Sequence, residues 1–252
     1  MLKYISIFKI FMSEIRPPMP RRNVTPEQVE NGQLRIFYNY LKNLGIKEED
    51  LRDKTILDVG ASSGSFGDVA VRFGAKVVSV DSARPKDWQD VLDGDSKKLF
   101  GISAGAIEIK DKLGLETEPQ FDYVFSHYSV PYVIVNEEQD KAGRWKTKST
   151  PENWHMEMIK RVKDDLSNIV NHLAIGGQAI LFPLFLHLDS EEAMSVDFTH
   201  GEKRDVREFN EVVHQVLREF YDTYRDKFDI KLEIVPQKDG VNFTRLLVTR
   251  HL

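Results

Sequence analysis

LDVGASSGSF, residues 57–66, shapes the expected architecture more than any other segment of this chain. It overlaps the short apolar run TILDV (residues 55–59), which is typical of a buried strand, and it leads into a helical pattern that Gly74 ends. Glycine permits a tight turn between strand and helix and lets a ligand approach the backbone closely. A second apolar run, KVVSV at residues 76–80, closes on Asp81. Strand, glycine turn, helix and strand in this order predict a parallel α/β sheet.

The same alternation extends to both sides of this unit. A helix is expected from Thr25-Pro26 to Gly45, because Thr25 can cap it and Pro26 suits its first turn. Its buried face is expected to carry apolar side chains at helical spacing: Val29, Leu34, Phe37, Tyr38 and Leu41. The other expected elements are a strand near 99–102, a strand at 122–125, a helix from Thr150-Pro151 to Gly176-Gly177, a strand at 179–182 and a helix over 205–225.

The C-terminal end differs from the rest. Two strand-like runs, residues 230–235 and 242–249, flank Lys238-Asp239-Gly240, and Asp-Gly between such runs is a strong hairpin signal. The predicted fold class is therefore α/β and doubly wound. It consists of a mostly parallel seven-stranded sheet with helices on both faces and a C-terminal antiparallel hairpin.

Composition narrows the class of protein. The 252 residues suffice for one large domain, expected over 25–252 behind a basic, proline-containing arm at 1–24. The absence of cysteine excludes disulfides, a cysteine nucleophile and thiolate-ligated zinc, and it suits a cytoplasmic location. The net charge is −5, but the arm carries +4, so the remainder carries −9. That acidic body disfavours broad attraction to nucleic acid, and no apolar run is long enough for an integral membrane segment.

The glycine turn and a second acid predict a binding site for an adenosine-type ligand. Asp81 closes the second strand 21 residues after Gly60, where its carboxylate can accept hydrogen bonds from two ribose hydroxyls. A dinucleotide loop would have glycine at the positions of Ser62 and Ser65, and a P-loop would end in Gly-Lys-Ser or Gly-Lys-Thr. Asp58 at the end of the first strand would repel a pyrophosphate but can help to hold a cationic ligand.

These residues resemble a known family. Asp58-x-Gly60-x-x-x-Gly64 and Asp81 are similar to the first two motifs of class I S-adenosylmethionine-dependent methyltransferases. FDYVFS at 121–126, Gly176-Gly177 before AILF at 179–182, and the terminal hairpin resemble that family's later strands, so that the likeness covers about residues 50–252. It implies S-adenosylmethionine as the cofactor, bound by the half of the domain at about residues 50–130.

The resemblance also implies roles for single residues. Gly60, Ala61, Ser62 and Gly64 would line the methionine and ribose parts of the cofactor, Asp81 would bind the ribose, and Ser126 with His127 would face the sulfonium and the methyl acceptor. Two positions depart from the family. Ser62 replaces the middle glycine of the loop, and SAGA at 103–106 stands where an acid near the adenine is often found, which leaves Ser103 as the polar candidate there.

Methyl transfer from a sulfonium needs mainly an aligned nucleophile, and a base only where the acceptor must lose a proton. The expected acceptor is an O or N atom of a small molecule or of a polymer-linked group. His127 is the candidate base and Tyr128 a second catalytic candidate, with a structural role for His127 as the alternative reading. The polar connections at about 133–150 and 184–204 are expected to form the acceptor site. No metal site is expected, because His187, Asp197 and His200 form no full ligand set.

Three alternatives stay open. The first is an RNA or DNA methyltransferase that uses the basic arm around Arg16 to Arg22, although Ser129-Val130-Pro131-Tyr132 departs from the motif of amino-directed nucleic-acid methyltransferases. The second is a binding module of the same fold without activity. The third is a dehydrogenase, which the serines of the glycine loop disfavour. The sequence does not identify the methyl acceptor or the oligomeric state.

Overall fold

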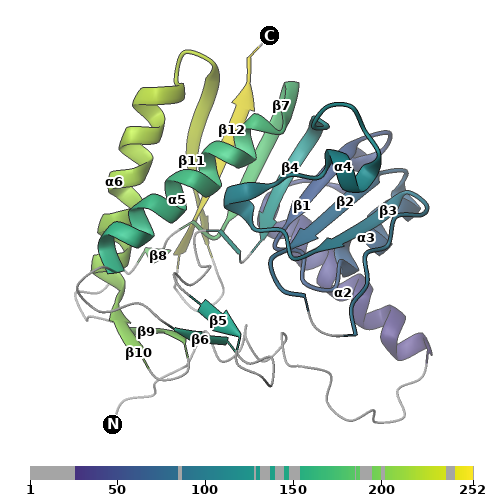
Figure 1. The fold of residues 1–252 in the computed structure, drawn as a ribbon, viewed down its shortest axis with the longest axis horizontal. Coiled ribbons are helices and arrows are strands. Elements are labelled where there is room, and N and C mark those ends of the chain that lie inside the picture. Colours follow the sequence, from purple (N-terminus) through teal and green to yellow (C-terminus); the bar gives the residue numbers. More distant parts are fainter. Residues whose placement is uncertain are drawn as a thin grey trace.

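A single twisted sheet organises the molecule (Figure 1). The computed structural model describes residues 26–84, 87–127, 129–130, 137–139, 145–147, 154–184, 186–187, 195–199, 202–236 and 242–251. The main strands are β1 (Thr55–Val59), β2 (Lys76–Asp81), β3 (Ser96–Phe100), β4 (Phe121–His127), β7 (Leu173–Phe182), β11 (Phe228–Pro236) and β12 (Asn242–Arg250). They lie side by side in the order β11-β12-β7-β4-β1-β2-β3, and the two-residue strand β8 (Leu186–His187) also pairs with β12.

The direction of the strands agrees with the sequence pattern. From β3 through β2, β1 and β4 to β7 all neighbours are parallel. β12 is antiparallel to both β7 and β11, because β11 and β12 form the hairpin at the C-terminal end. The row of seven strands, mostly parallel and closed by an antiparallel hairpin, confirms the predicted fold class.

Helices cover both faces of the sheet (Figure 1). On one face lie α2 (Pro26–Leu44) and α3 (Ser65–Ala70), which the 3-10 turn η2 (Val71–Phe73) continues. On the other lie the 3-10 turn η3 (Ala104–Ala106) and the helices α4 (Lys110–Leu113), α5 (Trp154–Asn171) and α6 (Val206–Tyr224). The 3-10 turn η1 (Glu48–Leu51) leads into β1. The doubly wound arrangement follows from the alternation of strands and helices.

The two faces bury different side chains. Between the sheet and α5 and α6 lies a mostly aliphatic cluster, the aliphatic core, whose fully buried members include Leu57, Val124, Val162, Leu166 and Leu181. Between the sheet and α2 and α3 lies the aromatic core, which includes Phe37, Tyr40, Phe66, Phe125, Phe182 and Phe243. Aromatic rings there pack in a continuous series, with Phe37 stacked on Phe66 at 5.5 Å between ring centres and Phe66 on Tyr40 at 4.5 Å.

The structure corrects the expected face of α2. Tyr38 was expected to point inward with Phe37 and Leu41, but 48% of its surface is exposed, and its hydroxyl donates to Glu48 at 3.1 Å. Tyr40 is buried instead. The buried positions Phe37, Tyr40, Leu41 and Leu44 follow the three- and four-residue spacing of a helix strictly, whereas Tyr38 lies off that stripe.

Several boundaries also differ from those expected. The strand expected near residues 99–102 is β3, which begins at Ser96. α5 ends at Asn171, and Gly176-Gly177 lie inside β7 and do not end the helix. A Cβ at Gly177 would approach the carbonyl oxygen of Phe121 to 2.7 Å, so glycine is needed there for contact between β7 and β4. β4 extends through Ser126 and His127, which were expected to follow it.

The two long connections contain short hairpins. β5 (Glu137–Gln139) pairs with β6 (Trp145–Thr147), and β9 (Ser195–Thr199) pairs with β10 (Glu202–Asp205), both antiparallel. The sequence predicted only polar loops there, because three- to five-residue strands leave little periodicity to detect. Within the described ranges no helix combines the length and the apolar content that a bilayer span would need.

Candidate functional site

The candidate site lies at the carboxyl ends of β1, β2 and β4. Parallel pairing places Val59 of β1 between Val80 of β2 and Ser126 of β4, so that the segments after these strands meet at one edge of the sheet. The turn after β1 brings Gly60, Ala61, Ser62 and Gly64 to this edge. In an open α/β sheet, this edge is where ligands bind.

The amide groups of this turn are largely satisfied within the protein. Gly60 and Ala61 both donate their N–H groups to the carbonyl of Val80, at 2.8 and 3.1 Å. Ser62 donates its N–H to Asp81 Oδ2 at 2.6 Å, and Gly64 donates to the carbonyl of Ala61 at 2.9 Å. A loop that binds pyrophosphate offers its N–H groups to the ligand. Most of the donors in this turn are already used, which disfavours an anion as the occupant.

Asp58 is a fully buried acid beside the turn. The hydroxyl of Tyr40 donates a short hydrogen bond to its Oδ1, and its Oδ2 has no hydrogen-bond partner among the described residues. Burial, opposed by the Tyr40 hydrogen bond and reinforced by the negative charge of Asp81, raises the pKa of Asp58 to about 7. A buried carboxylate oxygen without a partner is costly, and it gains most from a cation or a hydrogen-bond donor.

Asp81 closes β2 and holds the turn in place. Its Oδ2 accepts from Ser62 N–H, and its Oδ1 accepts from Ala83 N–H at 2.8 Å. Burial raises its pKa, although both backbone hydrogen bonds oppose that rise. Each carboxylate oxygen has two acceptor positions, so Asp81 can still accept further hydrogen bonds from a ligand.

The position of Gly60 has two physical reasons. Its φ of +73° is a conformation that favours glycine, and a Cβ there would overlap the side chain of Ser129, in the segment after β4. Ser129 therefore already lies against the backbone of Gly60. A ligand that contacts Gly60 itself must displace Ser129, whereas Ala61, Ser62 and Ser63 present a partly or fully exposed surface.

Ser126 and His127 point to opposite faces of β4. Ser126 is fully buried on the aliphatic side, and its Oγ accepts the N–H of Val130 at 3.0 Å, which braces the turn after the strand. His127 lies on the aromatic side, with its ring centre 4.0 Å from that of Tyr40. Burial lowers the pKa of His127 to about 3, so the imidazole is neutral at physiological pH.

α2 supplies partners that the sequence did not reveal. Asn43 Nδ2 lies 2.9 Å from His127 Nε2, and because the amide nitrogen is only a donor, Nε2 accepts and Nδ1 carries the proton. The backbone carbonyl of Asn43 accepts a hydrogen bond from the Arg245 side chain of β12 at 3.1 Å. Tyr40 and Asn43, three residues apart on one helix, thus connect Asp58 of β1 with His127 of β4. In the sequence, Tyr40 and Asn43 could have been noticed as side chains with polar groups on or beside the apolar face of the predicted helix.

The SAGA segment has a packing role. Ile102 donates its N–H to the carbonyl of Asp81 at 2.9 Å, which brings Ser103 to the same edge as the glycine turn. The next residues form η3, which packs on α5. A Cβ at Gly105 would lie 2.9 Å from Asp165 Oδ1. Glycine at position 105 therefore leaves room for the buried side chain of Asp165 on α5, and no acid is present in the segment itself.

Other sequence-predicted positions are not placed. Tyr128, Tyr132, His200 and the arm at residues 1–24 lie outside the described residues, as do the side chains of His187 and Asp197. In the part of the chain that is described, no three His, Asp or Glu side chains gather in a way that could hold a metal ion.

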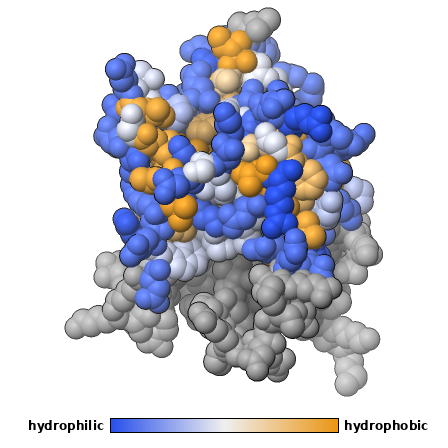
Figure 2. All heavy atoms as spheres, turned by 90° about the vertical axis from the view of Figure 1, so that its right-hand side faces the viewer, coloured by the Kyte–Doolittle hydropathy of each residue, from blue (hydrophilic) through white to orange (hydrophobic). Residues whose placement is uncertain are grey.

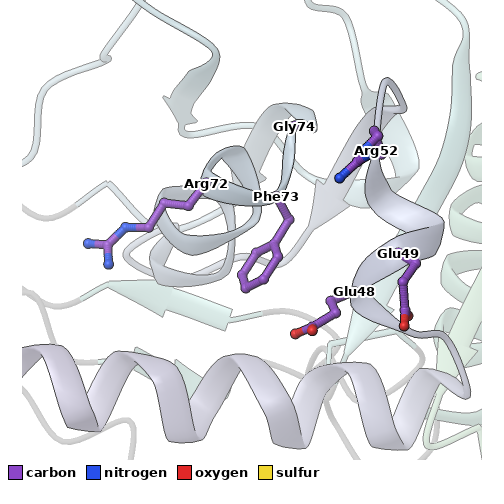
Figure 3. Close-up of a pocket in the computed structure, with 6 residues that line it drawn as sticks. All are labelled: Glu48, Glu49, Arg52, Arg72, Phe73 and Gly74. Carbon is purple, nitrogen blue, oxygen red and sulfur yellow. The ribbon is translucent and has the colours of Figure 1, made fainter.

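A hollow of about 400 Å³ lies at the opposite edge of the sheet, where η1 leads into β1 and η2 into β2 (Figure 3). It is lined by Glu48, Glu49, Arg52, Arg72, Phe73 and Gly74. Two of its charged side chains already have partners outside it, since Arg72 pairs with Glu30 at 2.9 Å and Glu48 accepts from Tyr38. It lies at the amino ends of the strands and takes no part in the candidate site.

No protein-family model matches the chain, and no curated protein matches its sequence. The solved structures to which the chain is similar include the following three. A candidate hemolysin from Lactococcus lactis is 16% identical, with 86% of each chain covered and a TM-score of 0.46. Magnesium protoporphyrin IX methyltransferase from Synechocystis, with bound S-adenosylmethionine, is 12% identical over 92% of this chain and 86% of its own, with a TM-score of 0.42. The N-methyltransferase NodS from Bradyrhizobium japonicum, in complex with S-adenosylhomocysteine, is 13% identical over 97% of this chain and 98% of its own, with a TM-score of 0.42.

Proposed function

We propose that the chain is an S-adenosylmethionine-dependent methyltransferase that acts on an O or N atom of a small molecule or a polymer-linked group. One observation carries the proposal. A fully buried carboxyl group, Asp58, and a partly buried one, Asp81, flank a glycine turn whose amide groups are mostly used within the protein. Such a site is electronegative and short of free donors, and it therefore favours a ligand that brings positive charge and hydroxyl groups.

S-adenosylmethionine has these groups. Its ammonium and sulfonium are cationic, and its ribose offers two hydroxyls. The unpartnered Oδ2 of Asp58 fits the cationic amino-acid end, directly or through water, and Asp81 retains acceptor capacity for the ribose. Ala61, Ser62 and Gly64 would line the ligand between these acids, and Ser103 would lie near its adenine end. Pyrophosphate would meet the same two carboxylates without matching donors, which disfavours a dinucleotide.

The cofactor supplies an activated methyl group, and the chain supplies alignment and exclusion of water. His127 remains the candidate base for an acceptor that loses a proton. Its Nε2, however, accepts from Asn43, so proton removal there requires that the amide turns away. A base whose pKa lies far below 7 also takes up a proton weakly. We therefore assign most of the rate enhancement to positioning of the acceptor and exclusion of water.

The acceptor would be bound by the connections at about 133–150 and 184–204. They leave β4 and β7 at the same edge of the sheet as the glycine turn, and β5–β6 and β9–β10 lie within them. Long connections in a compact domain usually carry function. Together with the domain at 25–252 and its cofactor half at about 50–130, these acceptor loops complete the proposed enzyme.

Calorimetric titration tests the proposal. Purified protein is titrated with S-adenosylmethionine, S-adenosylhomocysteine and NAD in parallel. Saturable binding is expected for the first two ligands and none for NAD. Asp81→Ala is expected to weaken donor binding about 10- to 100-fold, because hydrogen bonds to a charged group contribute about 1.5–3 kcal/mol each.

Asp164→Ala is the matched control, since Asp164 lies on α5 with half of its side chain exposed and should leave binding unchanged. Saturable binding of NAD alone, or equal affinities for wild type and Asp81→Ala, would contradict the proposal. Incubation with methyl-labelled donor and cell extract then distinguishes an enzyme from an inactive binding module, because only an enzyme transfers label to an acceptor pool.

A further inference from the structure

The two edge strands of the sheet differ in how their outer side is covered. On β3, Lys98 exchanges two backbone hydrogen bonds of 2.8 Å with Val91, and Phe100 donates its N–H to the side chain of Asp90 at 2.9 Å. Short segments of the chain therefore block this edge. Figure 2 shows the molecule from this side, where hydrophobic side chains form small separate patches among hydrophilic ones.

On β11, by contrast, no described residue pairs with the outer side of the strand. β11 is nine residues long, and Leu232 and Ile234 are 50% and 61% exposed. An unpaired edge of this length that carries exposed apolar side chains is a template for a further strand. Ile230, Leu232 and Ile234 alternate onto the face that carries α6, whereas Lys231 and Glu233 lie on the opposite face.

We propose that β11 is a homodimer interface, at which β11 of a second copy pairs antiparallel across a two-fold axis at Leu232. In this register Leu232 faces Leu232 of the second copy, Lys231 faces Glu233, and Ile230 faces Ile234. Each of the two Lys–Glu pairs joins opposite charges, and the three apolar positions of both copies form one continuous stripe. A two-fold axis makes the surface complementary to itself.

Neighbouring registers are disfavoured by charge. A shift by one residue in each copy would place either Lys231 opposite Lys231 or Glu233 opposite Glu233, and like charges directly opposite are destabilising. Glu233 remains available because Arg245 binds only its Oε2. Lys231, which also contacts Asp229 at 2.6 Å, is exposed on the strand. The charges of β11 thus disfavour the registers centred on Lys231 and Glu233 and are compatible with a second copy of β11 as the partner.

The absence of cysteine permits a direct test of this register. Leu232→Cys places one thiol opposite its equivalent, within the Cβ separation of about 4.5–5.5 Å of a facing antiparallel pair. Ile234→Cys places an equally exposed thiol four residues from its equivalent along the strand, about 13 Å away. Under mild oxidation, Leu232→Cys is expected to form a covalent dimer on a non-reducing gel, and Ile234→Cys to remain monomeric. Equal cross-linking of both variants, or of neither, overturns the register.

Sedimentation of the full-length protein tests the dimer itself. Wild type is expected to associate as its concentration rises, and Lys231→Glu to associate about tenfold more weakly, because two attractive pairs become repulsive. Lys160→Glu makes the same charge change on an exposed lysine of α5 and should leave association unchanged. A wild type that sediments as a monomer at all concentrations, or equal effects of both charge variants, overturns the proposal. Circular dichroism melts show that each variant is folded.

Discussion

Both faces of the sheet are covered by helices, but they bury different kinds of side chain. The face under α5 and α6 is filled mainly by Leu, Val and Ile, whereas the face under α2 and α3 combines aliphatic side chains with a series of packed aromatic rings. The aromatic face also holds the buried carboxyl of Asp58 and the imidazole of His127, both with strongly shifted pKa values. The difference teaches that one face supplies stability to the fold, and that the other gives up stability to hold polar groups beside the candidate site.

The largest expected effect is on the aliphatic face. Leu166 of α5 is 1% exposed, and Leu166→Ala is expected to lower the free energy of unfolding by about 2–5 kcal/mol, because it removes buried methyl groups and leaves a cavity. Denaturant titration measures the loss. Leu115→Ala, at a position 45% exposed, is the control and should change little. If Leu166→Ala also weakened the binding of S-adenosylmethionine by the folded protein, the aliphatic face would contribute to the site as well as to stability, which would contradict this comparison.

The next effect is a gain in stability on the aromatic face. Folding raises the pKa of Asp58 from 3.8 to about 7, so the native state binds its proton more tightly, and stability from this group falls as the pH rises through 7. Asp58→Asn removes that loss. The variant is expected to gain about 2–4 kcal/mol over wild type at pH 8 relative to pH 5, since one pKa unit corresponds to about 1.4 kcal/mol.

Thermal melts of both proteins from pH 5 to 9 measure this difference. His127 has the opposite sign, because its pKa falls from 6.5 to about 3 on folding, and the stability that it contributes is lost as the pH falls below 6.5. In Asp58→Asn, the loss of stability below pH 6.5 that arises from His127 should therefore be measurable. Asp58→Asn is also expected to weaken donor binding, and a variant that gained stability without losing affinity would remove Asp58 from the proposed site.

A smaller effect is expected from the hydrogen bond between Tyr40 and Asp58 on the aromatic face. Tyr40→Phe keeps the ring stacked on Phe66 but leaves both oxygens of Asp58 without a partner. The expected cost is about 1–3 kcal/mol of unfolding free energy, as for other buried acceptors that lose their donor. The Tyr40 hydrogen bond lowers the pKa of Asp58, so without it a larger fraction of Asp58 is protonated near neutral pH. The variant should therefore also bind S-adenosylmethionine less tightly near neutral pH. An unchanged titration of Asp58 by NMR would contradict this account.

The sequence predicted the acids and the glycine turn of the candidate site better than the α2 side chains that contact this site. Asp58, Gly60 and Asp81 follow directly from strand ends and a glycine turn, which leave local signals in the sequence, and the structure brings them together. The contacts of Tyr40 and Asn43 depend on how α2 docks across β1 and β4, and helical periodicity does not determine that geometry. The SAGA segment was interpreted by comparison with a family pattern, whereas in the structure the side chain of Asp165 on α5 lies close to Gly105 and explains the glycine there. Tertiary contacts of this kind are set by packing between distant elements.

The smallest effect concerns the backbone of the turn, where the aromatic face meets the site. Ser62 has a φ of +51°, which costs a non-glycine residue about 1–2 kcal/mol. Ser62→Gly relieves that cost but increases the freedom of the unfolded chain, so a net gain of about 0.5–1 kcal/mol is expected. Its N–H still donates to Asp81, so donor affinity should change little. Ser63→Gly is the matched control: Ser63 has no positive φ, and its hydroxyl bonds Ser65 at 2.7 Å, so the same change should destabilise the protein. If both variants lost stability, the positive φ of Ser62 would not be a source of strain in the native protein.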